Sequence, residues 1–326
     1  KGNSTAMSKY AQMNYNGEGG SVDKKEACKY YKMAADKGNS FSMVEYAKMK
    51  FYGDDDVPVN KQTAAFYCKM AINKGDESAV KFYSIILSDD DIPITKDDDI
   101  RYIKLAVDEG NSAAMFKYAN ALYYNNNFDD SNKREAVHYC KMAVDKGDVN
   151  AMNLYGQMLF DGDPLTENKK EGIKYFKMAL DKGHMNALVN YAVKLYNGDG
   201  IKQNKKEAIK YLKTAVDSDN SDAMYEYANI LLNGPFASFN KKEAIRYYMR
   251  SISKGNSNAL FKYGELLYDG VVLPFDRVEA SRCFKKAADL GNSNAMYRYA
   301  RMLSKEENEG IESDYNEALK YIKMGM

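Results

Sequence analysis

The side chains that most often carry catalysis are few in this chain and lie far apart. Its 326 residues include two histidines, His138 and His184, and neither lies at a short spacing from a cysteine, as zinc ligands do. No set of nucleophile, base and acid can be grouped from the spacing of residues. We therefore expect no catalytic residue, no metal site and no cofactor, and we expect both histidines to be ordinary surface or boundary residues.

Three runs of aspartate could instead hold a cation or dock a basic peptide. They are Asp54–Asp56, Asp89–Asp91 and Asp97–Asp99. An EF-hand loop requires alternating Asp or Asn, a central Gly and a distal Glu, and these runs lack that spacing. We expect solvated loop acids, with a docking patch for a basic partner as the alternative.

Pairs of basic residues also recur along the chain. They are Lys24-Lys25, Lys133-Arg134, Lys169-Lys170, Lys205-Lys206 and Lys241-Lys242. Such pairs could line up as a stripe that binds phosphate or an acidic polymer, or they could form a soluble outer edge, which we favour. The formal net charge is only +1, which is not the electrostatic pattern of a nucleic-acid-binding protein.

The elements that must position these residues are indicated by the stretch Asp23–Gly38. Asp23 followed by Glu26 is a helix capping box, and Gly38 can adopt the left-handed conformation that ends a helix. Between them, apolar residues recur at helical spacing. Similar stretches occur at Asn132–Gly147, Asn168–Gly183, Asn240–Gly255 and Asp276–Gly291.

The closing glycine of this stretch marks a repeat of about 36 residues. The marks are Gly2, Gly38, Gly75, Gly110, Gly147, Gly183, Asp219, Gly255 and Gly291. A fixed period of this length predicts a helical solenoid, in which each unit buries its core against its neighbours. We expect one domain over 1–326 with repeats near 2–37, 38–74, 75–109, 110–146, 147–182, 183–218, 219–254, 255–290 and 291–326.

Each repeat is predicted to hold two helices, A and B, which differ in their fixed positions. Eight residues after each mark, in helix A, stands a tyrosine: Tyr10, Tyr46, Tyr83, Tyr118, Tyr155, Tyr191, Tyr227, Tyr263 and Tyr299. The next position is always Ala, Gly or Ser, which lets two helices approach closely. Helix B is predicted to begin at a capping residue fifteen positions before the next mark: Asp23, Asn60, Thr95, Asn132, Asn168, Asn204, Asn240, Asp276 and Asp314.

These positions resemble the Sel-1-like repeat, a relative of the tetratricopeptide repeat. The stretch from Leu195 to Ile201 and the stretch from Asn204 to Ala208 follow the family pattern closely, whereas the loop from Ser88 to Pro93 departs from it. The resemblance covers essentially the whole chain. It implies an all-α fold, a right-handed α-solenoid superhelix of about nine helix–turn–helix units with roughly eighteen helices and no strands.

The four cysteines all lie in helix B of different repeats: Cys28, Cys68, Cys140 and Cys283. Some members of the family that this chain resembles are secreted and carry a disulfide in each repeat. Here each of the four repeats holds a single cysteine. We therefore expect reduced, buried thiols and a reducing, cytoplasmic location. The sequence shows no signal peptide, lipidation motif or apolar run of membrane-spanning length, so we expect no membrane partner.

One face of helix A is the predicted binding surface. Positions six and ten after each mark share a face apart from the core positions, and resemblance to the tetratricopeptide arrangement implies that this face lines the concave side. We call it the helix A face; its predicted partner-binding residues are Phe116, Asn120, Asn153, Gln157, Val193, Tyr225, Asn229, Phe261, Glu265, Tyr297 and Arg301. Aromatic rings interleaved with amides suit a peptide or a partner helix. The alternative is that the rings pack between adjacent repeats.

These features predict a non-enzymatic scaffold or adaptor that binds a protein or peptide and no nucleic acid. The alternative is a regulatory repeat region of a larger enzyme, for example a protein kinase, whose catalytic domain lies outside this chain. Related arrays occur in quality-control adaptors of the endoplasmic reticulum, in bacterial effectors and beside kinase domains. The first residue, Lys1, and the end at Met326 inside a helix B both suggest a piece of a longer chain.

Overall fold

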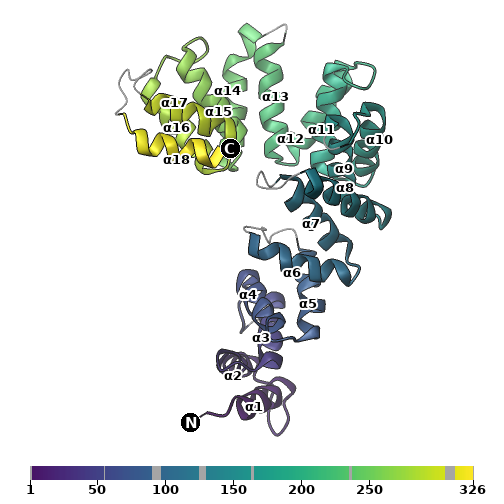
Figure 1. Ribbon diagram of the computed structural model, residues 1–326. Helices are drawn as coiled ribbons and strands as arrows, with labels where there is room; N and C mark the ends of the chain where they lie inside the picture. Colours follow the sequence, from purple (N-terminus) through teal and green to yellow (C-terminus); the bar gives the residue numbers. More distant parts are fainter. Residues whose placement is uncertain are drawn as a thin grey trace. The chain divides into compact units, whose positions relative to one another are not determined.

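The computed structural model describes residues 2–54, 56–89, 97–124, 130–162, 165–234, 237–304 and 313–325, with the backbone alone at 97–99, 130 and 237–239. The fold divides into two compact units, residues 1–158 and 159–326. Within each unit, helices that follow one another in the chain pack side by side (Figure 1). The predicted Asp55, Asp90, Asp91 and Thr95 lie outside the described residues.

Helices A and B alternate without exception. The helices A are α1 (Ser4–Asn16), α3 (Ser40–Tyr52), α5 (Glu77–Leu87), α7 (Ser112–Tyr124), α9 (Val149–Asp161), α11 (Met185–Asn197), α13 (Ser221–Asn233), α15 (Ser257–Asp269) and α17 (Ser293–Leu303). The helices B are α2 (Lys24–Asp36), α4 (Lys61–Ile72), α6 (Asp97–Asp108), α8 (Asp130–Asp145), α10 (Lys169–Asp181), α12 (Lys205–Asp217), α14 (Ala237–Ser253), α16 (Arg277–Asp289) and α18 (Tyr315–Gly325). The prediction of an all-α solenoid with about eighteen helices is confirmed, and the described residues contain no strand beyond an isolated bridge from Asp54 to Val57.

The helix ends follow the predicted chemistry at most repeats. The marks Gly38, Gly147 and Gly255 have positive φ of 89°, 85° and 83°, and Asp219, at the same position, has φ 60°. An aspartate at this strained position is held by Arg250 of the next helix B and by Lys254 just after that helix, which ion-pair with its carboxylate.

Two predicted helix starts are wrong. Asn132 and Asn240 lie inside α8 and α14, which begin at Asp130 and Ala237. No glycine or proline stands between the observed start and either Asn, so nothing interrupts the backbone hydrogen bonding there. Elsewhere the caps are as predicted: the side chains of Asp23, Asn60, Asn168, Asn204, Asp276 and Asp314 each accept a hydrogen bond from the backbone N–H three residues later.

The core is built from the same positions in each repeat. In α13 the residues five, eight, nine and twelve after the mark, Met224, Tyr227, Ala228 and Leu231, are all buried. The helix A tyrosine meets an aromatic ring of helix B edge to face in the pairs Tyr10–Tyr30, Tyr46–Tyr67, Tyr83–Tyr102, Tyr118–Tyr139, Tyr191–Tyr211, Tyr227–Tyr247 and Tyr299–Tyr321, with ring centroids 4.6–6.2 Å apart. These contacts join the two helices of one repeat.

A second set of contacts joins successive repeats. Lys285 of α16 donates to Glu317 of α18 at 2.7 Å and lies 5.6 Å from the ring of Tyr299, whose hydroxyl donates to the same carboxylate at 3.2 Å. Lys104 makes the same contacts with Glu135 and Tyr118. The helix A tyrosine therefore contacts both its own helix B and the preceding one.

The caps of helices A also link repeats. Asn220, Asn256 and Asn292 each accept from the backbone N–H three residues later. Their amide groups then donate to the preceding helix A, reaching Asn186, Asp222 and Asn258 respectively, at 2.7–2.9 Å. One side chain thus caps the start of a helix and links it to the preceding helix A.

The four thiols are free, as predicted. Cys68, Cys140 and Cys283 are buried, and Cys28 is partly buried. The Sγ atom of Cys68 donates to the backbone oxygen of Ala79 at 3.1 Å, and that of Cys140 donates to Ala151 at 3.4 Å. Burial raises the pKa of Cys68 to about 12, so this thiol stays protonated and unreactive in the folded chain.

Candidate interaction surface on helices A

The predicted binding residues are divided between the two units. Phe116, Asn120, Asn153 and Gln157 belong to the first unit, and the other seven belong to the second. Nine of the eleven are partly buried, while Tyr297 and Arg301 are exposed. Val189, at the same position as Tyr225, is buried and belongs to the core.

In the first unit the helix A face is formed by α7 and α9. The Tyr124 hydroxyl, at the end of α7, donates to Oε1 of Gln157 at 3.3 Å. The amide of Gln157 is thereby engaged by the neighbouring helix A. The predicted aromatic at this position, Phe116, is partly buried beside the core of α7.

In the second unit the face runs over α11, α13, α15 and α17. Tyr225 lies 6.2 Å from the buried ring of Tyr248, and Phe261 lies 5.5 Å from Phe284, as measured between ring centroids. Tyr248 also donates its hydroxyl to Oδ1 of Asn229 at 2.5 Å. These rings are anchored on one side by the core and remain partly open on the other.

Charged groups interleave with these rings. Lys262 pairs with Glu265 on α15 at 2.9 Å. Near the chain end, the guanidinium of Arg301 lies 5.8 Å from the ring of Tyr297 on the same helix. The face therefore offers rings, amides and charges on successive helices, which is the mixture that peptide-binding surfaces use.

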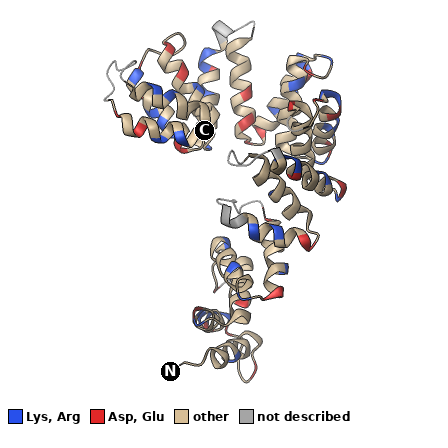
Figure 2. Ribbon diagram, in the orientation of Figure 1, with Lys and Arg blue, Asp and Glu red and all other residues tan. Residues whose placement is uncertain are grey.

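Three ion pairs join members of the predicted basic stripe or acidic runs to charged residues of a neighbouring repeat. Lys24 pairs with Asp54, Lys61 pairs with Asp89 at 2.7 Å, and Lys169 pairs with Asp199 at 3.0 Å. In each pair the first lysine of a helix B reaches the loop of the next repeat. The contacts therefore link neighbouring repeats. Figure 2 shows Lys and Arg interspersed with Asp and Glu in both units.

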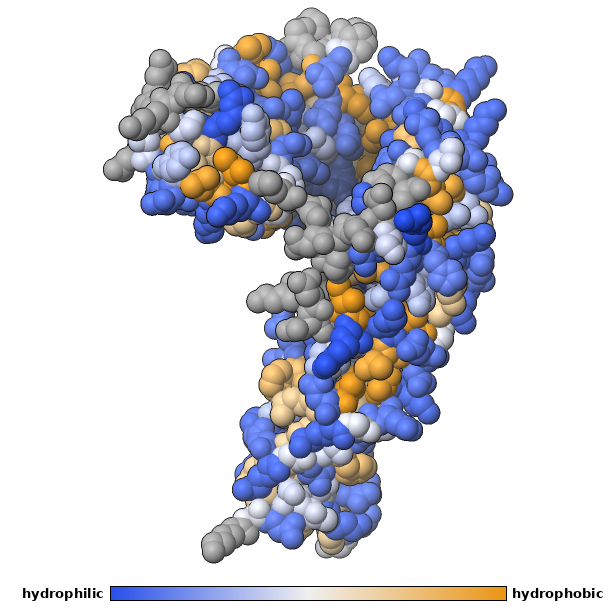
Figure 3. Space-filling view, viewed as in Figure 1, coloured by the Kyte–Doolittle hydropathy of each residue, from blue (hydrophilic) through white to orange (hydrophobic). Residues whose placement is uncertain are grey.

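The visible surface is mostly hydrophilic, with apolar residues gathered in separate patches (Figure 3). Among the described helices, none is both long and apolar enough to span a membrane. The part of the chain that the structure describes also contains no group of His, Cys, Asp and Glu able to hold a metal ion.

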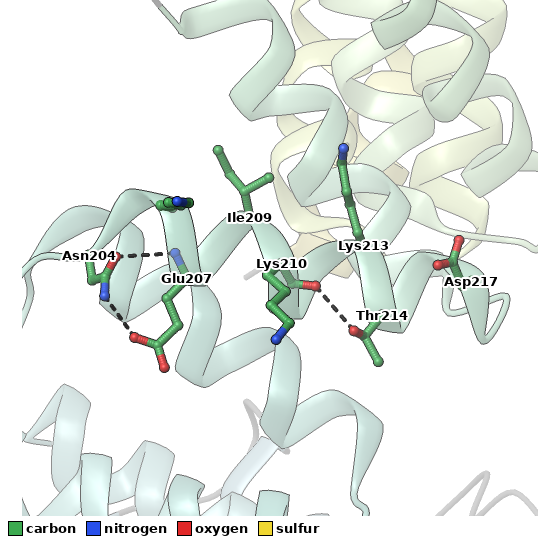
Figure 4. A pocket seen from close by; sticks show the side chains of 8 residues that line it. Asn204, Glu207, Ile209, Lys210, Lys213, Thr214 and Asp217 are labelled. Carbon is green, nitrogen blue, oxygen red and sulfur yellow. Dashed lines mark hydrogen bonds between the residues drawn. The ribbon is translucent and has the colours of Figure 1, made fainter.

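A depression of about 760 Å³ lies along helix α12. Its lining comes from one helix and its cap, and Lys210 and Lys213 project from it (Figure 4). Asn204 donates to Glu207 at 2.7 Å, and the Thr214 hydroxyl donates to the backbone of Lys210 at 3.2 Å. Because its polar groups bond to one another along a single helix, this depression has no convergent set of groups for chemistry.

Neither histidine belongs to a site. His138 is exposed on α8. His184 caps α11, where its Nδ1 accepts from the backbone N–H of Ala187 at 3.0 Å. It takes the position that Asn occupies at other helices A, which explains why a histidine stands just after a closing glycine.

Two charged residues were missed by the sequence analysis. Lys117 is buried on α7 and donates to the backbone oxygen of Asp89 at 2.8 Å. Glu226 is partly buried on α13, between Tyr225 and the core residue Tyr227. Both stand seven residues after a mark, a position that the predicted face left out, although charged residues at Lys262 and Arg298 could have signalled it.

The chain belongs to the Sel1 repeat family. The Sel1 repeat matches at residues 4–39, 40–76, 112–148, 149–184, 186–220, 221–256, 257–292 and 293–325. Residues 77–111, between two of these matches, hold the helix pair α5 and α6. The predicted family is therefore confirmed, and proteins of this family are generally non-catalytic scaffolds that bind other proteins. No curated protein matches the chain in sequence.

Solved structures share the fold at low sequence identity. A protective antigen of uropathogenic Escherichia coli, described as having an SLR fold, is 19% identical with a TM-score of 0.54 and covers 99% of this chain and 69% of its own. A Sel1 repeat protein from Oxalobacter formigenes is 23% identical with a TM-score of 0.50, over 80% of this chain and 98% of its own. An immunity protein from Pseudomonas aeruginosa is 16% identical with a TM-score of 0.54, over 66% and 80%.

Proposed function

We propose that this chain is a non-enzymatic scaffold that binds an extended segment of a protein partner along the helix A face of its second unit. The observation that carries the proposal is a series of aromatic side chains at one position of three successive helices A. Tyr225, Phe261 and Tyr297 stand at this position, and each keeps part of its surface open, up to 61% for Tyr297.

Rings in such a series suit partner recognition for two physical reasons. An aromatic side chain has only two rotatable bonds, so it supplies a large contact area with little loss of conformational entropy. Anchoring on the core, as for Phe261 against Phe284, keeps the ring oriented before the partner arrives. The charged side chains between the rings, such as Glu265 and Arg301, can bind polar groups of an extended peptide.

The test uses peptides of about twelve residues selected from a random library on the immobilised full chain. Tyr297→Ala should weaken the selected peptides by about tenfold, since truncating an aromatic anchor commonly costs more than about 1 kcal/mol. The matched control is Met249→Ala, which removes an apolar side chain of similar exposure, 56%, from helix B α14. Equal binding by wild type and Tyr297→Ala would refute the proposed face.

A photo-crosslinking residue locates the bound peptide independently. Placed at position 297 it should label the peptide, and placed at position 249 it should not. Labelling at position 249 alone would move the binding surface to helices B.

A further inference from the structure

One carboxylate beside the helix A face forms no ion pair among the described residues. Glu226 lies on α13 next to Tyr225, and it makes no ion pair with any residue that the structure describes. Its one hydrogen bond is a long contact of 3.4 Å from the Asn229 amide. A partly buried carboxylate with so few partners is costly in a folded protein, because burial removes water that would otherwise solvate the charge.

The neighbouring charged groups make their direct contacts with residues other than Glu226. Lys262, on α15, pairs with Glu265. Lys194, on α11, lies over the ring of Phe160 at 3.7 Å from its centroid. On the turn before Glu226, Asp222 accepts from the amide of Asn256.

The polar neighbours of Glu226 are likewise fixed in place. The carbonyl oxygen of Asn229 accepts from Tyr248, so its amide nitrogen is directed toward Glu226. Tyr248 is fully buried and holds this arrangement from the core side. Burial raises the pKa of the Glu226 carboxyl above its ordinary value. The Asn229 amide and the positive charge of Lys194 oppose this shift, and the negative charge of Asp222 adds to it.

We propose that Glu226 receives an arginine or lysine side chain of the partner, so that the second unit recognises an extended peptide with a basic residue. The inference rests on the proposed function and names the chemistry of its ligand. The cation would pair with the Glu226 carboxylate while its alkyl stem packs along the ring of Tyr225. A guanidinium, with its fork of donors, can bind both carboxylate oxygens.

An anionic ligand does not fit this position. Glu226 and Glu265 both act on the ring hydroxyl of Tyr248, so two carboxylates converge on the same region. Of the nearby cations, Lys262 is already paired with one of them. The local field therefore favours a positive group, and charge complementarity selects the partner.

The test is a double-mutant cycle on the peptides selected above. A peptide containing a single arginine is compared with the same peptide carrying citrulline, the neutral isostere, on wild-type chain and on Glu226→Gln. We expect the arginine to be worth about tenfold in Kd on wild type and nearly nothing on Glu226→Gln, because the pair interacts only when both charges are present. Glu207→Gln, on α12, is the matched control and should leave the arginine effect intact.

The outcomes separate this inference from the proposed function. Selected peptides that lose affinity with Tyr297→Ala but show no basic residue, or no coupling to Glu226, would overturn the inference and leave the binding face standing. Peptides insensitive to both substitutions, or no binding peptide at all, would count against both. Circular dichroism of Glu226→Gln is expected to match wild type, since the substitution keeps the shape of the side chain.

Discussion

The tyrosine of helix A shows how one side chain can serve three contacts. Tyr299 packs edge to face on Tyr321, lies beneath the ammonium of Lys285 and donates to Glu317. A phenylalanine could make the first two of these contacts, and only a tyrosine makes the third. The same hydroxyl contact, from Tyr118 to Glu135, accounts for tyrosine at this position of α7.

Removing the hydroxyl should therefore cost stability without disturbing the packing. Tyr299→Phe should lower the free energy of unfolding by about 0.5–1.5 kcal/mol, because the partly buried carboxylate of Glu317 loses a hydrogen bond. Tyr299→Ala should cost about 3–5 kcal/mol, since it also removes the ring from the core. Urea denaturation measures both, and Tyr297→Phe, on the exposed side of the same helix, should change nothing. If Tyr299→Phe leaves the free energy of unfolding unchanged, Lys285 alone is sufficient to satisfy the carboxylate of Glu317.

The ionised carboxyl of Glu226 should lower the stability of the folded chain, whereas the Tyr299 hydroxyl raises it. Its pKa is raised by burial in the folded state, so the folded chain holds this proton more tightly than the unfolded chain does. The stabilising contribution of the proton is present below the ordinary pKa of a glutamate and is lost as the pH rises through the raised pKa. The charge of Asp222 favours the proton and that of Lys194 opposes it.

Glu226→Gln should therefore be as stable as wild type at low pH and more stable at neutral pH, by up to about 1 kcal/mol. Thermal unfolding across this pH range gives the comparison. A variant that is less stable than wild type at neutral pH would mean that the carboxylate supports the fold.

At the scale of the element, the sequence predicted which segments form helices and where most of them end. Residues such as Asp23 and Gly38 made this prediction possible, because a capping residue and a closing glycine act on the backbone within a few residues. The starts of α8 and α14 were missed because a residue suited to capping at Asn132 or Asn240 does not stop a helix that its predecessors can extend. Where either of two residues could begin a helix, packing against the neighbouring helices decides between them. The local sequence does not specify that packing.

Within a repeat, the facing side chains of helix A and helix B also complement one another in volume. Gly264 of α15 faces Phe284 of α16, and a Cβ atom at Gly264 would lie 2.8 Å from the phenylalanine ring. The other repeat with glycine at this position of helix A, Gly156, also has phenylalanine, Phe176, at the same position of helix B as Phe284. The close packing of the interior accounts for the pairing.

Gly264→Ala should therefore destabilise the chain by about 1–3 kcal/mol, although alanine is the better helix former. Adding Phe284→Leu, which frees space, should recover part of the loss, and the double-mutant cycle should show a favourable coupling. Additive effects of the two substitutions would argue that the ring can move aside at no cost.

At the scale of the whole molecule, nearly every contact links a helix to one close by in the chain. The core of α15–α18 is a cluster of its own, with Phe284 fully buried in it. Stability in such an array is a sum of local terms and of interfaces between neighbouring repeats. That the chain forms a single array over both units remains a prediction, as does the concave position of the helix A face.

Phe284→Ala tests this locality. It should cost about 3–5 kcal/mol and raise amide hydrogen exchange in α15–α18, with little change in α1–α4. A uniform rise in exchange over all helices would instead indicate a single cooperative unit.

The proposed binding surface could be predicted from the sequence less completely than the fold. Tyr225, Phe261 and Tyr297 could be chosen from their spacing because they share a position on helix A. Glu226 could not, because its lack of an ion pair depends on the direct contacts that Lys194 and Lys262 make with Phe160 and Glu265. Asn229 is the opposite case. The sequence predicted that its amide binds a partner, but in the structure this amide is hydrogen-bonded to Tyr248 and Glu226.

The two kinds of contact have different consequences when repeats are duplicated or deleted by recombination. Gly264 and Phe284 lie in one repeat, so a copied segment of 36 residues carries both partners with it. Lys169 and Asp199 lie in successive repeats, so a junction between them separates the partners and leaves two charges to find new ones. Complementary core residues are thus copied together with their repeat. The ion pairs between repeats, in contrast, must form again at the new junction after every change in array length.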